Sequence, residues 1–225
     1  MKGCLVALGI LAGLMVLVAG YVWLNIYHID VRYRLTVEVQ DGDQIKIGSS
    51  VIEASYSIQP DYLSAYPSTY ARIHGYAPTV DLGEKGMLFL TFSNAMRSTE
   101  GQTERNKQIF CPFTDIGCLP FAAYHETAKS NDSGEKQSSL HKLLRNSGPR
   151  EVSFIALPEL ARFVNADGQH ELVQVSPYDL ATSFGPGVQL KRVILELTND
   201  PITPQPQMWP RWLKDSGKTY VGELS

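Results

Sequence analysis

An uncharged, apolar run from residue 3 to residue 24, directly after Met1 and Lys2, most constrains what this chain can fold into. It contains no Asp, Glu, Lys, Arg, His or Pro, and its apolar residues are not confined to one face of a helix. As a helix the run is about 30 Å long, which matches the hydrocarbon core of a bilayer. It therefore predicts a single transmembrane helix over residues 1–27, with the lipid bilayer as its partner.

A cleaved secretory signal is the competing interpretation of this segment, because Val18-Ala19-Gly20 offers a small-residue cleavage site. The apolar stretch, however, exceeds the roughly 7–15 residues of a typical signal peptide. Tyr21, Trp23 and Tyr27 also gather at its far end, and aromatic side chains favour the headgroup layer. We therefore expect an uncleaved signal anchor with these three residues at the membrane interface.

Charges on the two sides of the helix nearly balance, since Lys2 lies on one side and Arg32 and Arg34 on the other. The positive-inside rule thus leaves the orientation open. A short basic head usually stays in the cytoplasm, which favours the inner membrane with the bulk of the chain in the periplasm. Gly9 and Gly13 form a small-xxx-small pair through which two helices can pack as a homodimer, although such pairs are common in membrane helices without any role.

Composition limits the function of the remaining chain. The net charge of the 225-residue protein is −3, and Lys and Arg are not clustered as in a nucleic-acid-binding surface. Apolar residues make up 44% of the chain, enough for a core beyond the anchor. We expect a globular domain over residues 28–200 and a tail over 201–225, where four prolines between 201 and 210 exclude a regular helix.

Strict alternation of apolar and polar residues over 31–40 is typical of a half-buried strand. Asp41-Gly42-Asp43 then predicts a tight turn, and 44–58 a second strand with a bulge at Gly48-Ser49-Ser50. Further extended stretches are expected at 71–82, 87–92, 152–156, 171–175 and 190–198, whereas 158–164 fits a strand or a short helix equally well.

Helical patterns are confined to an insertion near 119–146, with one segment over 119–127 and another over 137–145. Strands thus outnumber helices, and the helices are segregated in the middle of the sequence. This order predicts an α+β, predominantly β layered domain behind a single N-terminal transmembrane helix.

His125 and Glu126 form the most suggestive acid–base pair, because a helix would hold the two side chains near each other. No nucleophile stands at a useful spacing, so the pattern favours a solvated helix face over a catalytic site. Cys111 and Cys118 are spaced for a small disulfide loop, which would indicate an oxidising compartment; two unrelated buried thiols are the alternative. No cofactor motif or metal-ligand spacing is present.

The stretches 32–39 (Arg-Tyr-Arg-Leu-Thr-Val-Glu-Val) and 48–53 (Gly-Ser-Ser-Val-Ile-Glu) resemble the opening of a group of uncharacterised proteobacterial membrane-anchored proteins. A second shared stretch is similar to 180–188, 190–192 and 200–203 of this chain. The resemblance covers pieces from about 32 to 213 and implies a bacterial envelope setting without any known activity.

Three functions are compatible with these features. The first is a membrane-anchored, periplasm-facing binding or structural module that associates with another envelope protein. The second is an envelope hydrolase that uses His125 and Glu126 or an acid from a loop. The third is a sensor or assembly factor that acts through helix pairing at Gly9 and Gly13. The absence of a catalytic set in the sequence favours the first.

Overall fold

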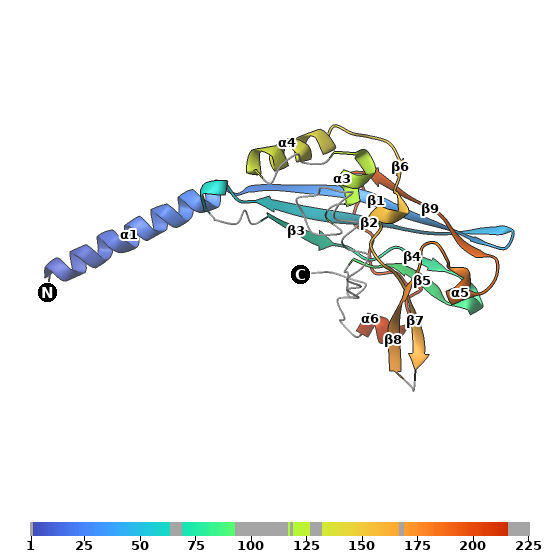
Figure 1. Ribbon diagram of the computed structural model, residues 1–225. Coiled ribbons are helices and arrows are strands. Elements are labelled where there is room, and N and C mark those ends of the chain that lie inside the picture. Colours follow the sequence, from blue (N-terminus) through green and yellow to red (C-terminus); the bar gives the residue numbers. More distant parts are fainter. Residues whose placement is uncertain are drawn as a thin grey trace.

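The computed structural model describes residues 2–63, 69–92, 117, 119–126, 132–166 and 169–215. Within this part the protein is α+β and mostly strand, with two antiparallel sheets and short helices packed against them (Figure 1). The predicted α+β, predominantly β domain is thus confirmed.

Helix α1 (Lys2–Leu24) projects away from the folded body and leads almost directly into strand β1 (Tyr27–Asp41) (Figure 1). Its described side chains begin at Gly9, and every residue from there to Tyr21 is exposed. Among the helices of the described part of the chain, none is both long and apolar enough to span a membrane.

The larger sheet has the order β3-β2-β1-β9-β6. Its centre is a hairpin of two 15-residue strands, β1 and β2 (Gln44–Ile58), which pair from Tyr27 opposite Ile58 to Asp41 opposite Gln44. Gly42 in the connecting turn has φ +58°, a conformation that glycine adopts without strain. The remaining strands of this sheet are β3 (Thr69–His74), β9 (Val188–Leu197) and β6 (Arg150–Glu151).

The smaller sheet has the order β4-β5-β7-β8 and packs against the part of the hairpin near its tip. Its strands are β4 (Thr79–Asp81), β5 (Met87–Leu90), β7 (Leu160–Ala166) and β8 (Gln169–Val175). The ambiguous stretch at 158–164 is therefore resolved as a strand.

Short helices complete the body. Helices α3 (Leu119–Tyr124) and α4 (Ser133–Leu143) cover the larger sheet on the side near α1, as Figure 1 shows. Asp132 caps α4, because its carboxylate accepts hydrogen bonds from the amides of Gly134 and Glu135. The others are α5 (Ala181–Phe184), α6 (Arg211–Asp215) and the 3-10 turns η1 (Asp61–Leu63), η2 (Gly83–Lys85) and η4 (Phe154–Ala156).

Alternation in the hairpin places one face of the larger sheet in the core. The odd-numbered residues of β1 from Val31 to Val39 are at most 2% exposed, and the even-numbered residues of β2 from Ile52 to Ile58 are fully buried. The opposite face, here called the outer face, carries Arg32, Arg34, Thr36 and Glu38 of β1 and Ser49, Glu53, Ser55 and Ser57 of β2. The alternation of apolar and polar residues in the sequence thus correctly predicted which side chains face the core.

Three sequence-based expectations of local structure are wrong. The β1–β2 register runs without a shift through Gly48-Ser49-Ser50, so this segment is no bulge; the irregularity of β1 lies in its pairing with β9, between Glu38 and Val39. Residues 152–156 do not form a strand, because the amide of Ala156 bonds to Ser153 O in the 3-10 turn η4 instead. The stretch at 71–82 is also interrupted, since the chain leaves the sheet at Gly75.

The proline-rich segment after residue 200 belongs to the folded body as far as it is described. Trp209 and Leu213 are 4% and 5% exposed, and α6 begins directly after Pro210. At the smaller sheet the Trp209 ring contacts Phe89, with the ring centroids 6.0 Å apart.

Candidate functional site

In the larger sheet, β3 ends at His74, and the C-terminal segment around Thr203 lies beside β2 from there on. We call this junction between β2, β3 and Thr203 the seam. Glu53 is the first residue of β2 that pairs with β3, opposite His74, the last residue of β3. Two residues earlier, Val51 bonds to Thr203 instead: the Val51 amide donates to Thr203 Oγ1 at 2.7 Å, and the Thr203 amide donates to Val51 O at 3.1 Å. The C-terminal segment thus acts as a substitute strand.

Gly75 lets the chain leave the sheet at this point. Its φ is +127°, and a Cβ added there would come within 3.3 Å of both Val51 O and Ile202 Cγ2. A side chain at this position would be strained and would crowd the substitute strand. The seam therefore depends on a glycine that secondary-structure patterning does not single out.

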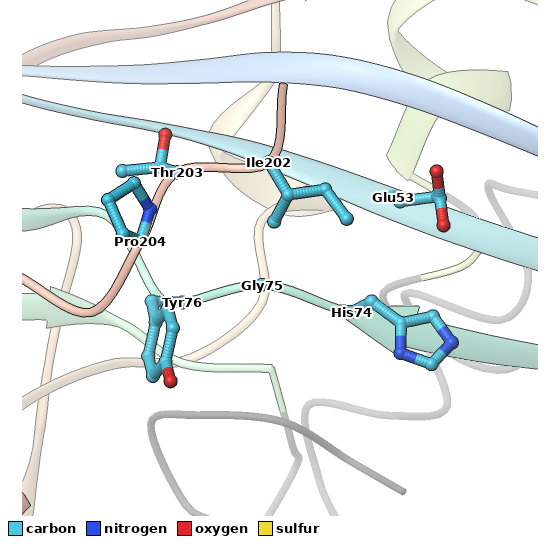
Figure 2. Close-up of a pocket in the computed structure, with 7 residues that line it drawn as sticks. All are labelled: Glu53, His74, Gly75, Tyr76, Ile202, Thr203 and Pro204. Carbon is cyan, nitrogen blue, oxygen red and sulfur yellow. The ribbon is translucent and has the colours of Figure 1, made fainter. Parts of the chain in front are cut away.

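A cavity of about 350 Å³ lies in the seam. Figure 2 shows its wall: the carboxylate of Glu53 and the imidazole of His74 lie at one end, the ring of Tyr76 and Pro204 lie at the other, and Ile202 stands between them. The lining residues are Glu53, His74, Gly75, Tyr76, Ile202, Thr203 and Pro204. A cavity with one polar end and one apolar end is typical of a binding site for a small group.

Charge at the polar end is set by a cross-strand ion pair. Glu53 Oε2 accepts a hydrogen bond from Arg32 Nε at 2.6 Å, and its side chain is only 15% exposed. Arg32 thus neutralises the carboxylate from the β1 side, while His74 stands next to it on the β3 side. The polar end can accept or donate hydrogen bonds without carrying an unpaired charge.

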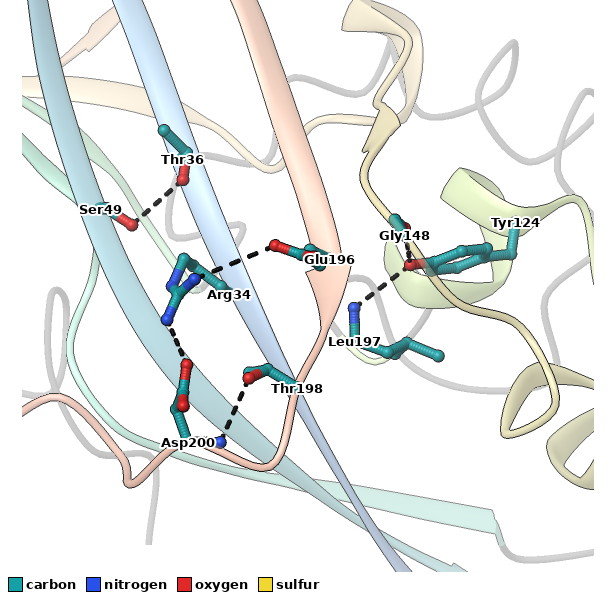
Figure 3. A network of polar contacts seen from close by, with 9 residues as sticks. All are labelled: Arg34, Thr36, Ser49, Tyr124, Gly148, Glu196, Leu197, Thr198 and Asp200. Atoms are coloured by element: carbon teal, nitrogen blue, oxygen red, sulfur yellow. Dashed lines mark hydrogen bonds and ion pairs between the residues drawn. The ribbon is translucent and has the colours of Figure 1, made fainter.

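A second set of contacts, also on the outer face, positions the segment that forms the far wall of the cavity. Arg34 lies between two acids: Nη2 bonds to Asp200, and Nη1 is 3.9 Å from Glu196 Oε2 (Figure 3). The Asp200 amide donates to Thr198 Oγ1 at 3.2 Å. Exposed ion pairs of this kind add little stability. These contacts nevertheless hold the segment between the end of β9 and Thr203 against the outer face.

His125 and Glu126 do not form an acid–base pair on a helix. Helix α3 ends at Tyr124, and His125 has φ +57°, the one positive value among the described residues other than glycine. The His125 amide donates to Ala122 O and the Glu126 amide to Phe121 O, which is the pattern of a Schellman cap. Glu126 Oε1 accepts from Asn146 Nδ2 at 3.1 Å, so both residues have structural partners in this cap.

The predicted interface aromatics have different surroundings. Tyr21 is 58% exposed at the end of α1, whereas the Tyr27 hydroxyl lies 3.3 Å from His141 Nε2 of α4, with the two rings edge to face. The side chain of Trp23 lies outside the described residues. Gly9 and Gly13 face open space, with nothing within 4 Å of an added Cβ.

The predicted disulfide between Cys111 and Cys118 falls outside the described residues. No group of three or more His, Cys, Asp or Glu side chains that could hold a metal ion occurs in the described part. The cavity residues were not found from the sequence because three separate segments supply them: Glu53, residues 74–76 and residues 202–204. These segments come together because β2 pairs with both β3 and Thr203.

Comparison with known proteins gives no relative: no family model, curated protein or solved structure matches the chain. The function must therefore be argued from the cavity and from α1.

Proposed function

We propose that the protein is a membrane-anchored binding module of the bacterial envelope, held in the inner membrane by α1 and exposing its folded body to the periplasm. The cavity between β2, β3 and Thr203 is the place where it binds a ligand or a group on a partner protein. The observation that carries this proposal is the exposure of α1, whose apolar side chains between Gly9 and Gly20 are all exposed.

Exposure of α1 is unfavourable in water. Seven consecutive or near-consecutive apolar residues are 55–74% exposed, namely Ile10, Leu11, Leu14, Met15, Val16, Leu17 and Val18. A contiguous exposed apolar surface marks a site of interaction. Removing apolar surface from water stabilises a protein by about 25 cal/mol for each Å² that is buried. The uncharged, apolar run of the sequence from residue 3 to residue 24 supports the proposal that lipid covers this surface.

The cavity favours reversible binding. Glu53 and His74 can orient a ligand that presents a hydrogen-bond donor, while Ile202, Pro204 and the Tyr76 ring contact an apolar portion. Binding sites of this type combine apolar walls with a few polar groups that select orientation. The same arrangement would suit a side chain of a partner protein.

A topology experiment tests the anchor. Full-length protein with a C-terminal alkaline phosphatase should be active, and the same protein with a C-terminal green fluorescent protein should be dark, if the body is periplasmic. The protein should also stay in the membrane pellet after alkaline carbonate extraction, and a Leu14→Arg, Leu17→Arg variant should move to the supernatant. Fluorescence of the green fluorescent protein fusion would overturn the proposal. Release of the unmodified protein from the membrane by alkaline carbonate would overturn it as well.

Photocrosslinking tests the cavity. p-Benzoylphenylalanine in place of Tyr76 should yield one discrete adduct in cells, and the adduct should disappear when His74→Ala is added. The same amino acid in place of Tyr178, which is 71% exposed and does not line the cavity, is the matched control. An adduct that is equally strong at position 178, or that persists in the His74→Ala variant, would show that the cavity is not the binding site.

Helix pairing is a second candidate function, that of a sensor or assembly factor. It is favoured by the open space around Gly9 and Gly13, which leaves room for a second helix at close approach. Ile10→Cys in a variant without the native cysteines should then crosslink two copies, and adding Gly9→Leu and Gly13→Leu should abolish the crosslinked dimer. The same yield with both leucines in place would exclude pairing through these glycines.

A further inference from the structure

The β1–β2 hairpin returns the chain to the end of α1. Ile58 at the end of β2 pairs with Tyr27 at the start of β1, and the turn η1 (Asp61–Leu63) follows three residues later. Figure 1 shows η1 beside the point where α1 meets the body. A segment far from α1 in the sequence thus lies next to it in space.

Tyr62 in this turn presents its ring to the surroundings. It is 64% exposed, and a side-chain hydrogen bond with Tyr21 raises the pKa of the Tyr62 phenol. Tyr62 in η1 and Tyr21 in the last turn of α1 are both exposed where these two elements lie side by side (Figure 1). A single exposed tyrosine needs no explanation, but two at the end of an apolar helix form an amphipathic cluster suited to a membrane interface.

Contacts with α4 fix the orientation of η1. Both carboxylate oxygens of Asp61 accept hydrogen bonds from the Ser133 amide at 3.2 Å, and the Ser133 hydroxyl donates to Oδ2 at 3.2 Å. The acidic side chain is thus turned towards α4 and engaged there. The neighbouring Tyr62 remains exposed.

We propose that η1 is a second membrane contact of this protein, in which Tyr62 lies beside Tyr21 in the headgroup layer of the bilayer. This inference rests on the proposed anchoring by α1. Two contacts, a spanning helix and an interfacial turn, restrict rotation of the body relative to the membrane. The long hairpin then points away from the bilayer and carries the cavity with it.

Site-specific crosslinking to lipid tests the contact in the full chain. p-Benzoylphenylalanine is placed in turn at Leu17, Tyr62 and Tyr178, which are 74%, 64% and 71% exposed. Cells are irradiated, and phospholipid adducts are measured by intact mass after purification. Leu17 reports on the anchor, and Tyr178 is a control of equal exposure three residues before α5, which lies at the end of the body away from α1 (Figure 1).

We expect lipid adducts at positions 17 and 62, with the yield at 62 several-fold above that at 178. An adduct at 17 with none at 62 would overturn the η1 contact and leave the anchor standing. No adduct at 17 would overturn the anchor itself, and the inference with it. A protein adduct in place of lipid at 62 would show that η1 binds a partner chain, which also contradicts the proposal.

Discussion

Gly48 of β2 lies against the backbone of Thr79 in β4 so closely that an added Cβ would be 2.2 Å from Thr79 O and 2.5 Å from its carbonyl carbon. The two sheets of the body therefore meet backbone to backbone at this point. Only a residue without a Cβ allows this approach, which is the reason for a glycine in the middle of a long strand.

Gly48→Ala should destabilise the protein by about 3 kcal/mol or more, because backbone atoms on both sides cannot yield as a flexible side chain would. Urea unfolding of the full chain in detergent, followed by tryptophan fluorescence, measures the change. Ser49→Ala is the matched control, since Ser49 is exposed. A Gly48→Ala protein as stable as the Ser49→Ala protein would mean that the sheets are not this close.

Glu38→Gln should lower the stability by about 1 kcal/mol at neutral pH. Glu38 is 8% exposed and accepts two hydrogen bonds from Arg192, at 2.8 and 2.9 Å. These bonds hold the pKa of Glu38 below its ordinary value, although burial opposes the shift.

A pH series provides the check for this ion pair. A depressed pKa stabilises the fold above the unfolded-state value of about 4.3 and loses this contribution as the pH falls through the folded-state value. The stability gap between the unmodified protein and Glu38→Gln should therefore narrow on acidification from pH 5 downward. A gap that stays constant or widens would contradict the assignment.

Thr203→Val should loosen the substitute strand, because Val51 then loses the acceptor of its amide while the Thr203 amide keeps its bond to Val51 O. We expect a loss of about 1 kcal/mol and faster hydrogen exchange of the Val51 amide. Thr36→Val serves as the control, as its hydroxyl pairs with Ser49 at the surface. Unchanged exchange at Val51 would show that the C-terminal segment does not hold the seam.

Trp209→Ala should cost about 3–5 kcal/mol, the range for a large buried side chain. Trp209 is 4% exposed, donates from Nε1 to Thr79 Oγ1 at 2.9 Å and packs edge to face with Tyr76. Trp212→Ala removes a ring that stacks on the exposed His170 at 3.7 Å and should cost less. Thermal unfolding distinguishes the two, and equal losses would contradict the different burial.

His125→Gly should leave the protein as stable as before or more stable, by up to about 1 kcal/mol, since glycine suits the left-handed position that ends α3. His125→Ala keeps the strain and should not stabilise. If a hydrolase activity of the envelope is traced to this protein, both variants should retain it. Loss of that activity in both, with the fold intact, would restore His125 as a catalytic candidate.

Prediction from the sequence succeeded where short-range periodicity decides the structure. The pattern over 31–58 revealed the central hairpin and its inward faces, because each side chain in a strand alternates with its neighbours whatever the rest of the chain does. It failed at 152–156, where local 3-10 hydrogen bonds replace strand pairing, and at Gly48, where the reason for glycine is a contact with another sheet.

The sequence by itself determined that an uncharged apolar segment precedes a strand-rich domain, and it identified most of the strands. Tertiary structure alone decided the candidate site. Val51 and Thr203 are 152 positions apart, and no local pattern predicts that the chain near Thr203 replaces β3 beside β2. Such a pairing follows from the packing of the whole sheet. The register of the β1–β2 hairpin likewise returns η1 to the end of α1 (Figure 1).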